Sequence, residues 1–233
     1  MTDWETSISS SGKDAVVRGE ELEDVMEMDF SDAIFLILKG ERPEKEESEM
    51  FNTVLSSCID HGVGNPSTVA ARTVQSGGNS MNTSVAAGIM ALGDSHGGAI
   101  EEAMRILQSD KTAEQIVKQY LEESKRLPGL GHKVYKDEDP RAVKIIEKAE
   151  TLGLAGKSIK KIQGIRDVLA EEKVDLVLNV DGAIAAVMTD LGWEPELGKG
   201  FFIIARTPGI VAHVREEMDE KPFRRQEGEY IGK

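Results

Sequence analysis

The chain has 233 residues, 39% of them hydrophobic, which is enough for one substantial core or two unequal lobes that share an interface. Its 28 Lys and Arg residues face 42 Asp and Glu residues, and the net charge of −14 argues against nucleic acid or an anionic membrane as a partner. No stretch approaches the ~20 apolar residues of a membrane span, and the opening residues lack the basic and apolar regions of a signal peptide, so we expect a cytoplasmic protein.

The N-terminal part of the chain predicts a small hairpin followed by a short helix. Thr6–Ser10 and Ala15–Arg18 have the character of strands and are separated by the turn-forming sequence Ser-Gly-Lys-Asp. Ser31 is a suitable N-cap for the short apolar segment Asp32–Lys39, which Gly40 ends.

Two further helices are predicted from apolar patterning. Pro43–Asp60 begins with a proline suited to a first helical position. Its apolar residues recur on one face and are Met50, Phe51, Val54, Leu55, Cys58 and Ile59. Because the single cysteine lies on that face, we interpret it as a buried thiol rather than a nucleophile. Ser80–Leu92, rich in Ala, Gly, Ser and Met, predicts a tightly packed central or inter-subunit helix.

Capping residues indicate two more helices in the second half of the chain. Thr112 begins a capping box for a helix over Ala113–Arg126, and Asp139 with Pro140 begins a helix that ends before Gly153. The apolar run 174–180 is a buried strand or a helix, because periodicity does not decide between them in so short a segment. The fold class expected is all-α, with the small hairpin as its only sheet.

Three of the four histidines lie beside glycines at helix boundaries. They are His61, His96 and His132, whereas His213 does not follow this pattern. Glycine at such a boundary lets backbone amides approach a ligand closely. A single histidine of this kind is usually structural, but three of them favour a functional site.

Asp181 lies in the apolar sequence Val-Leu-Asn-Val-Asp-Gly-Ala-Ile-Ala-Ala. Burial of an ionised carboxylate is costly, and desolvation raises its pKa toward the range that suits a general base. The alternative interpretation is a helix cap. Arg141 falls in the first turn after Asp139 and Pro140, where its side chain and the free helix amides can face one anion, which predicts a carboxylate site.

The sequence GLGHKVYKDEDPR, residues 129–141, resembles the signature of the citrate synthase superfamily. Four more blocks resemble the family's other motifs in the same order, and they are Asp60–Thr68, Asp94–Ala99, Asn179–Gly182 and Ala205–His213. The resemblance implies a shortened, two-lobed helical fold. The larger lobe, for dimerisation, would comprise residues 1–99 and 186–233, and the smaller lobe residues 100–185. The active site would lie in the cleft between them and close around substrate.

The resemblance also implies roles for individual residues. His96 would stabilise the enol of acetyl-CoA, Asp181 would move the α proton, and His132 would polarise the oxaloacetate carbonyl. A thioester α proton is weakly acidic, so its removal requires a desolvated base and a hydrogen-bond donor at the carbonyl oxygen. The implied carboxylate-binding residues are His61, Arg141 and Arg206.

The family's CoA segment follows the third histidine block. The implied CoA-binding residues are Gly129, Leu130, Gly131, Lys133 and Lys136. In an acidic chain, such a local concentration of lysine can still attract phosphates, although solvated surface lysines are the alternative reading. No metal and no permanently bound cofactor is implied, since coenzyme A enters as part of the substrate.

Arg224 and Arg225 resemble the family's terminal Arg-Pro-Arg segment, whose arginine reaches the neighbouring subunit's site. The proline is absent here, so either arginine is a candidate. A homodimer or a higher oligomer is implied.

The direction of the reaction depends on a shortened region. From Val16 to Pro43 the chain resembles the start of a citrate synthase, yet a single helix separates this part from Asp60. A chain shortened there resembles citryl-CoA lyase and the C-terminal module of ATP-citrate lyase, which cleave citryl-CoA to acetyl-CoA and oxaloacetate. A citryl-CoA synthetase would then be an upstream partner. The complete set of catalytic residues leaves citrate synthase or 2-methylcitrate synthase as the alternative, and a nonenzymatic or metal-binding relative as a third reading.

Overall fold

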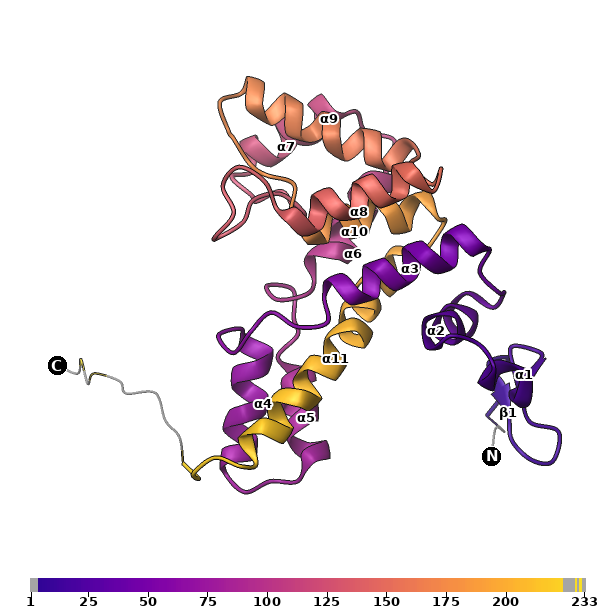
Figure 1. Ribbon diagram of the computed structural model, residues 1–233. Coiled ribbons are helices and arrows are strands. Elements are labelled where there is room, and N and C mark those ends of the chain that lie inside the picture. The colour runs from indigo at the N-terminus through magenta and orange to yellow at the C-terminus, as the bar shows by residue number, and fades with distance from the viewer. Residues whose placement is uncertain (1–3, 224–228, 230, 232–233) are drawn as a thin grey trace.

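The computed structural model describes residues 4–223, 229 and 231. These residues form eleven α-helices, a 3₁₀ turn over Pro195–Leu197 and three short strands. The helical fold class predicted from the sequence is confirmed. Figure 1 shows one group of helices above and another below, with α3 and α11 running between them.

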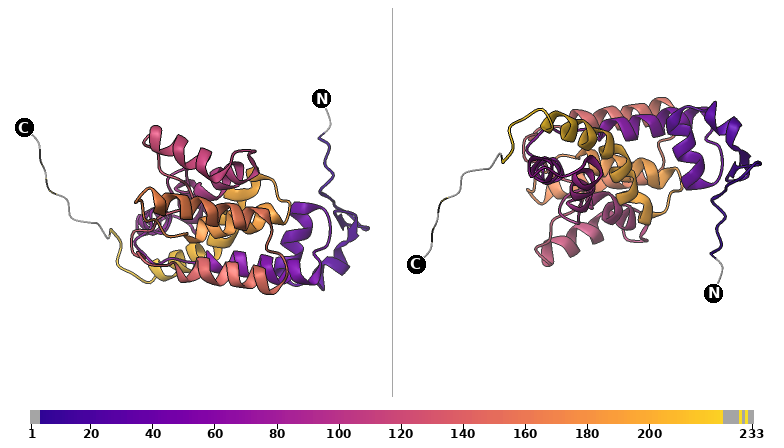
Figure 2. Two further views of the ribbon diagram at one scale, coloured as in Figure 1. Left: turned by 90° about the horizontal axis from the view of Figure 1, so that it is seen from above. Right: turned by 90° about the horizontal axis from the view of Figure 1, so that it is seen from below.

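The N-terminal hairpin is present and has a third strand that the sequence patterns did not indicate. Strands β1 (Ser9–Ser10), β2 (Val16–Val17) and β3 (Glu20–Glu21) form an antiparallel sheet in that order. Helix α1 (Leu22–Met26), which was also not predicted, follows directly and has no buried residue. This part of the chain lies at one edge of the molecule in every view (Figures 1 and 2).

Helix α2 (Phe30–Lys39) begins earlier than predicted. Asp29, rather than Ser31, is its N-cap, because the backbone of Asp29 is extended and its carbonyl accepts the amide of Ala33 (3.0 Å). The predicted end at Gly40 is confirmed, since this residue has the left-handed φ of 88° that glycine adopts readily.

Helix α3 (Lys45–Ser57) begins two residues after Pro43, because Glu44 and Glu47 form a capping box. Its predicted apolar face is largely confirmed, and the fully covered residues on it are Met50, Phe51, Val54 and Cys58, each 0–1% exposed. Ile59 was expected on that face but is 52% exposed, because the helix has already ended.

A compact group is formed by α4 (Pro66–Ser76), α5 (Met81–Met90) and the C-terminal half of α11 (Gly198–Glu217). A Cβ on Gly88 would lie 2.9 Å from the side chain of Ile210, so only glycine allows these helices to approach so closely. The tight packing predicted for the Ala- and Gly-rich segment is confirmed. Their small apolar cluster consists of Ala71, Ile210 and Val214.

The main core surrounds a single helix. Helix α10 (Val180–Asp190) packs against α6 (Ala99–Gln108), α8 (Pro140–Thr151) and α9 (Lys157–Glu171), and α9 in turn packs against α7 (Ala113–Glu122). Residues 183–188 of α10 are at most 1% exposed. Such complete burial explains the uninterrupted apolar character of this segment.

Two boundaries in this region have clear physical causes. Helix α7 ends at Glu122 rather than at Arg126, because Ser124 adopts a left-handed φ of 51° that stops the helix. The run 174–180 forms neither a strand nor a helix before α10 begins at Val180: it has an isolated bridge between Leu130 and Leu178, and the amide of Gly131 donates to the carbonyl of Val177 (2.7 Å). Neither of the two alternatives predicted for this segment is therefore observed.

The division into two lobes stays a prediction. Among the described residues, no helix has both the length and the apolarity that crossing a bilayer requires.

Candidate active site

A cavity of about 200 Å³ opens where the connections between helices meet. It is lined by every described residue to which the sequence assigned catalysis or carboxylate binding, and these are His61, His96, His132, Arg141, Asp181 and Arg206. They come from five separate segments of the chain. The fold thus brings together residues far apart in the sequence, since His61 and Arg206 are separated by 145 positions.

His96 lies in a tight turn between α5 and α6. The turn is closed by a hydrogen bond from its own amide to the carbonyl of Gly93 (2.9 Å). A Cβ on Gly97 would lie 2.7 Å from the ring of Phe202, so the neighbouring glycine lets the turn rest on that ring. Burial, followed by the charge of Arg206, lowers the pKa of His96, which keeps the imidazole neutral at pH 7.

Ser67 orients the ring of His96. The Nε2 atom of His96 lies 3.0 Å from Oγ of Ser67, and that hydroxyl also lies 2.6 Å from Oδ1 of Asn65. An amide oxygen can only accept, so the serine hydroxyl donates to Asn65 and accepts from Nε2 of His96, which places the proton of the neutral ring on Nε2. Ser67 is fully buried, so this orientation is protected from competing water.

The tautomer of His132 is fixed by the backbone. Its Nδ1 accepts hydrogen bonds from the amides of Val134 (3.1 Å) and Tyr135 (3.0 Å), so the proton of the neutral ring is on Nε2. Burial is the largest cause that lowers the pKa of His132, and Arg141 adds to it, while Asp139 acts in the opposite direction. The ring is therefore a neutral donor at pH 7.

The guanidinium of Arg141 lies beside the Nε2 atom of His132. Its Nη2 lies 3.3 Å from Nε2 of His132, so two donors converge on one point, and an oxygen between them would accept from both. Asp139 holds the guanidinium from behind, with its Oδ1 3.0 Å from Nε and its Oδ2 2.8 Å from Nη2. Burial opposes the ionisation of Asp139, but the hydrogen bonds from Arg141 outweigh it and lower its pKa.

Asp139 also joins two helix N-termini. Its side chain is the N-cap of α8 through the amide of Arg141 (3.0 Å), and it accepts the amide of Val180 at the start of α10 (3.1 Å). Because Asp181 follows Val180, this one carboxylate, 1% exposed, fixes the positions of Arg141 and of Asp181 relative to each other.

Asp181 lies in the first turn of α10, after the N-cap Asn179. Burial raises its pKa, and the charges of Arg141 and Arg206 only partly offset that effect. The helix-cap alternative is excluded, since the N-cap is Asn179, whose side chain accepts the amide of Gly182 (3.1 Å). Asp181 is therefore a buried carboxyl with a raised pKa in the cavity, and its role as a general base stays a prediction.

His61 and Arg206 complete the cavity. The ring centroid of His61 lies 6.3 Å from that of His132, with the rings nearly perpendicular. Burial lowers the pKa of His61, and the charges of Arg141 and Arg206 lower it further. Arg206 is 3% exposed and donates through Nε to the carbonyl of Cys58 (2.7 Å), which leaves the rest of its guanidinium for an anion.

A second pocket, of about 510 Å³, adjoins the cavity at His132. Of the residues predicted to bind CoA, it is lined by Leu130, Gly131, Lys133 and Lys136. Lys125 and Arg126 also line it, so the described part of this acidic chain has a local concentration of positive charge at that position. Gly129 instead packs against α10, where a Cβ would lie 2.6 Å from Cα of Gly182.

Two further sequence predictions, on the terminal arginines and on metal binding, are not tested by the geometry of the cavity. Arg224 and Arg225 lie outside the described residues. In the part of the chain that the structure describes, no three His, Cys, Asp or Glu side chains gather as a metal-binding group.

Ser67 and Asn179 were not recognised from the sequence as parts of the site. The Asn-Pro pair at 65–66 is a typical start of a helix and could have revealed α4, and with it the buried Ser67. The contact between Ser67 and His96 joins residues 29 positions apart, so no local pattern could have indicated it.

The family model for the C-terminal domain of citrate synthase matches residues 4–226. The chain therefore belongs to the citrate synthase family, whose enzymes form or cleave a carbon–carbon bond next to an acyl-CoA thioester. The resemblance that the five sequence blocks indicated is confirmed.

Three relatives show where the chain lies within this family. It is 46% identical to a citryl-CoA lyase from Hydrogenobacter thermophilus, with a TM-score of 0.93 over 99% of this chain and 95% of that one. ATP citrate lyase from Methanothrix soehngenii, solved with citrate and coenzyme A, shares the fold at 22% identity and a TM-score of 0.84, over 98% of this chain and 42% of that one. Citrate synthase 2 from Bacillus subtilis is 35% identical over 202 residues, which are 84% of this chain and 54% of that protein. The chain spans about half the length of the curated relatives it matches.

Proposed function

We propose that this protein is a citryl-CoA lyase, which cleaves citryl-CoA into acetyl-CoA and oxaloacetate. The observation that carries the proposal is the single cavity that unites His96, His132 and Asp181 with two arginines. The similarity to a citryl-CoA lyase along nearly the whole of both chains supports cleavage, whereas the curated citrate synthases are matched over about half of their length.

The cationic part of the cavity suits the four-carbon half of the substrate. Arg141 and Arg206 bring two guanidinium groups to a chain whose net charge is −14, and His61 adds a neutral ring beside them. Guanidinium groups bind carboxylates through paired hydrogen bonds, and partial burial strengthens these bonds. We assign the two carboxylates of the oxaloacetate portion to these three residues.

We assign to His132 the proton transfer at the carbonyl or hydroxyl oxygen of the four-carbon portion. In the condensation direction, the neutral ring donates its Nε2 proton to the oxaloacetate carbonyl oxygen as the carbon–carbon bond forms. The electron-rich ring left behind is stabilised by the amides of Val134 and Tyr135 and by the charge of Arg141. Cleavage is the reverse transfer: it begins with Nε2 deprotonated, in the state that these amides and Arg141 stabilise, and the tertiary hydroxyl proton then moves to Nε2.

His96 and Asp181 act on the acetyl portion. As the carbon–carbon bond breaks, negative charge develops on the thioester oxygen, and we assign stabilisation of this enolate to His96. Asp181 then supplies the proton that converts the enolate carbon to the methyl group of acetyl-CoA. Its raised pKa favours this proton transfer near neutral pH, because it increases the fraction of the carboxyl that is protonated.

The pocket beside His132 is proposed to hold coenzyme A. Lys133 and Lys136, with the two other basic residues there, would meet its phosphates, and the apolar lining from Leu130 would contact the rest. No permanently bound cofactor is part of this proposal.

Citrate synthase, or 2-methylcitrate synthase, is the second candidate, and the names of the curated relatives favour it. Cleavage and condensation use the same side chains, since each is the reverse of the other. Condensation followed by thioester hydrolysis would give citrate and free CoA.

A homodimer is proposed as the functional form. Val69 of α4 is 36% exposed and Met90 of α5 is 78% exposed, so this helix pair has apolar side chains available to a second subunit. Arg224 or Arg225 of the neighbouring subunit would then contribute to the site. A cytoplasmic location and an upstream citryl-CoA synthetase complete the proposal.

The test is to incubate the purified protein separately with citryl-CoA and with acetyl-CoA plus oxaloacetate, and to measure both sets of products. The lyase is supported by rapid release of acetyl-CoA and oxaloacetate, with little citrate formed in the second incubation. Efficient formation of citrate and free CoA would instead establish the synthase.

A further inference from the structure

Helix α11 contacts the segment before His61 at three points along one of its faces. Arg206 donates to the carbonyl of Cys58 (2.7 Å), and Nε2 of His213 lies 3.1 Å from Oδ1 of Asp60. Between them, a Cβ on Gly209 would lie 2.3 Å from the carbonyl oxygen of Ile59. Spacings of three and four residues place these positions on the same side of a helix.

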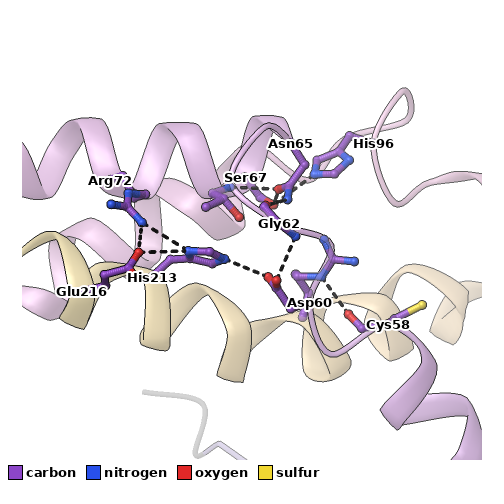
Figure 3. Close-up of polar contacts among 11 residues, drawn as sticks. Cys58, Asp60, Gly62, Asn65, Ser67, Arg72, His96, His213 and Glu216 are labelled. Carbon is purple, nitrogen blue, oxygen red and sulfur yellow. Dashed lines mark hydrogen bonds and ion pairs between the residues drawn. The ribbon is translucent and has the colours of Figure 1, made fainter. Parts of the chain in front are cut away.

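His213 is oriented by a fixed cation. Nη1 of Arg72 lies 3.4 Å from Nδ1 of His213, and a guanidinium can only donate, so Nδ1 accepts and the ring proton is on Nε2. Arg72 is itself held by Glu216 and by the buried Glu217, whose Oε2 lies 2.7 Å from Nε. His213 therefore donates its Nε2 proton to Asp60, as Figure 3 shows.

Asp60 connects His213 to the loop that carries His61. Its second oxygen accepts the amide of Gly62 (2.8 Å), which has a left-handed φ of 76°, so the carboxylate closes the turn around His61. On the other side, Nδ2 of Asn65 donates to the carbonyl of Gly62 (2.6 Å) (Figure 3).

Within the described part of the chain, the loop has little other support. Residues 61–64 are all exposed, and the side chain of Val63 is 58% exposed. A segment with so few buried contacts depends on its hydrogen bonds to keep one conformation. His213 does not line the cavity, so its effect on a ligand there is indirect, and its contact with Asp60 connects it to the loop of His61.

We propose that His213 is a positioning residue, which acts through Asp60 to hold His61 in the orientation that binds the four-carbon dicarboxylate half of the substrate. This role rests on the proposed function for the identity of that ligand. The helix that supplies Arg206 to the cavity thereby also sets the position of His61, so one face of α11 organises two of the carboxylate-binding residues.

The test compares the binding of oxaloacetate and of coenzyme A, each measured by calorimetry on the full chain. We expect His213→Ala to weaken oxaloacetate binding by about tenfold, the effect of losing a hydrogen bond to a charged group, and to leave the affinity for CoA unchanged. His213→Gln, whose amide nitrogen can take the place of Nε2, should recover most of the affinity. His213→Asn, which reaches only the place of Nδ1, should not.

Three further variants make the result decisive. Asp60→Ala removes the other end of the same hydrogen bond, so it should give the same loss, and the double variant with His213→Ala should lose no more than either single variant. Asp60→Ala also tests the proposal if His213→Ala does not fold. Arg215→Ala is the matched control, because Arg215 lies on the same helix, its ion pair among the described residues is with Asp219, and its side chain is 59% exposed.

The proposal is overturned if His213→Ala binds oxaloacetate as the unaltered protein does, if CoA affinity falls equally, or if Gln and Asn behave alike. It is also overturned if the unaltered protein does not bind oxaloacetate. Because these are binding measurements, they are separate from the catalytic test. A protein that binds oxaloacetate but neither cleaves citryl-CoA nor forms citrate would refute the proposed function alone.

Discussion

Asp139→Ala is expected to be the most damaging single substitution behind the active site. The carboxylate accepts four hydrogen bonds, from the amide, Nε and Nη2 of Arg141 and from the amide of Val180. Its removal leaves the guanidinium without its partner and two helix N-termini without their shared acceptor. The substitution therefore affects both the stability of the fold and the position of Arg141.

The magnitude follows from these contacts. Breaking a buried charge pair costs ~3–5 kcal/mol, and loss of an N-cap costs ~1 kcal/mol. The two effects overlap, because Oδ1 serves both, and the Arg141 side chain is 22% exposed, so water can solvate part of the released charge. We expect the free energy of unfolding to fall by about 3 kcal/mol, which corresponds to a decrease in Tm of roughly 6–12 °C.

Urea denaturation followed by circular dichroism measures this loss. Asp139→Asn is the matched control, since it keeps one oxygen for capping and should recover about 1 kcal/mol of the loss. Both variants should bind oxaloacetate more weakly, because Arg141 is no longer clamped. A loss below about 1 kcal/mol for Asp139→Ala, with unchanged oxaloacetate binding, would refute the reasoning.

Three other variants test separate parts of the site. Asp181→Asn should reduce turnover by about 10² or more, yet raise the free energy of unfolding at pH 7, because burial disfavours the charged carboxylate. Since the folded pKa is raised, this gain should begin to decline as pH falls through the folded pKa and should vanish below the unfolded pKa. Replacing Lys133 and Lys136 together with Gln should weaken CoA binding by about tenfold without changing oxaloacetate binding, and the effect should shrink at high salt. Gly182→Ala should cost ~1–3 kcal/mol in an unfolding titration, because its Cβ would lie 2.3 Å from the carbonyl oxygen of Gly129.

Local sequence patterns were sufficient to predict helix caps and helix ends that depend on interactions between neighbouring residues. The capping box at Thr112, the N-cap at Asp139 and the helix end at Gly40 were all predicted correctly, because each depends on a few adjacent residues. The start of a helix was harder to predict where more than one polar residue could serve as the N-cap, as Asp29 and Ser31 could for α2. The end of α7 at Glu122 depends on a left-handed serine, which no propensity indicates.

The site itself could be assembled from the sequence only through the resemblance to a family. Asp181 was expected to be buried and His132 to lie in a glycine loop, but nothing local places them in one cavity. The contacts that adjust them are long-range, such as Asp139 with Val180 across 41 positions and His213 with Asp60 across 153. Such pairs become apparent only when the helices are packed together.

The most direct test of the proposed chemistry is to run citryl-CoA cleavage in D₂O and to measure the mass of the acetyl-CoA released. If Asp181 delivers a solvent-exchangeable proton to an enolate held by His96, each acetyl-CoA should carry one deuterium in its methyl group, and Asp181→Asn should release little product. Formation of citrate and free CoA from citryl-CoA, or acetyl-CoA that carries no deuterium, would contradict the account.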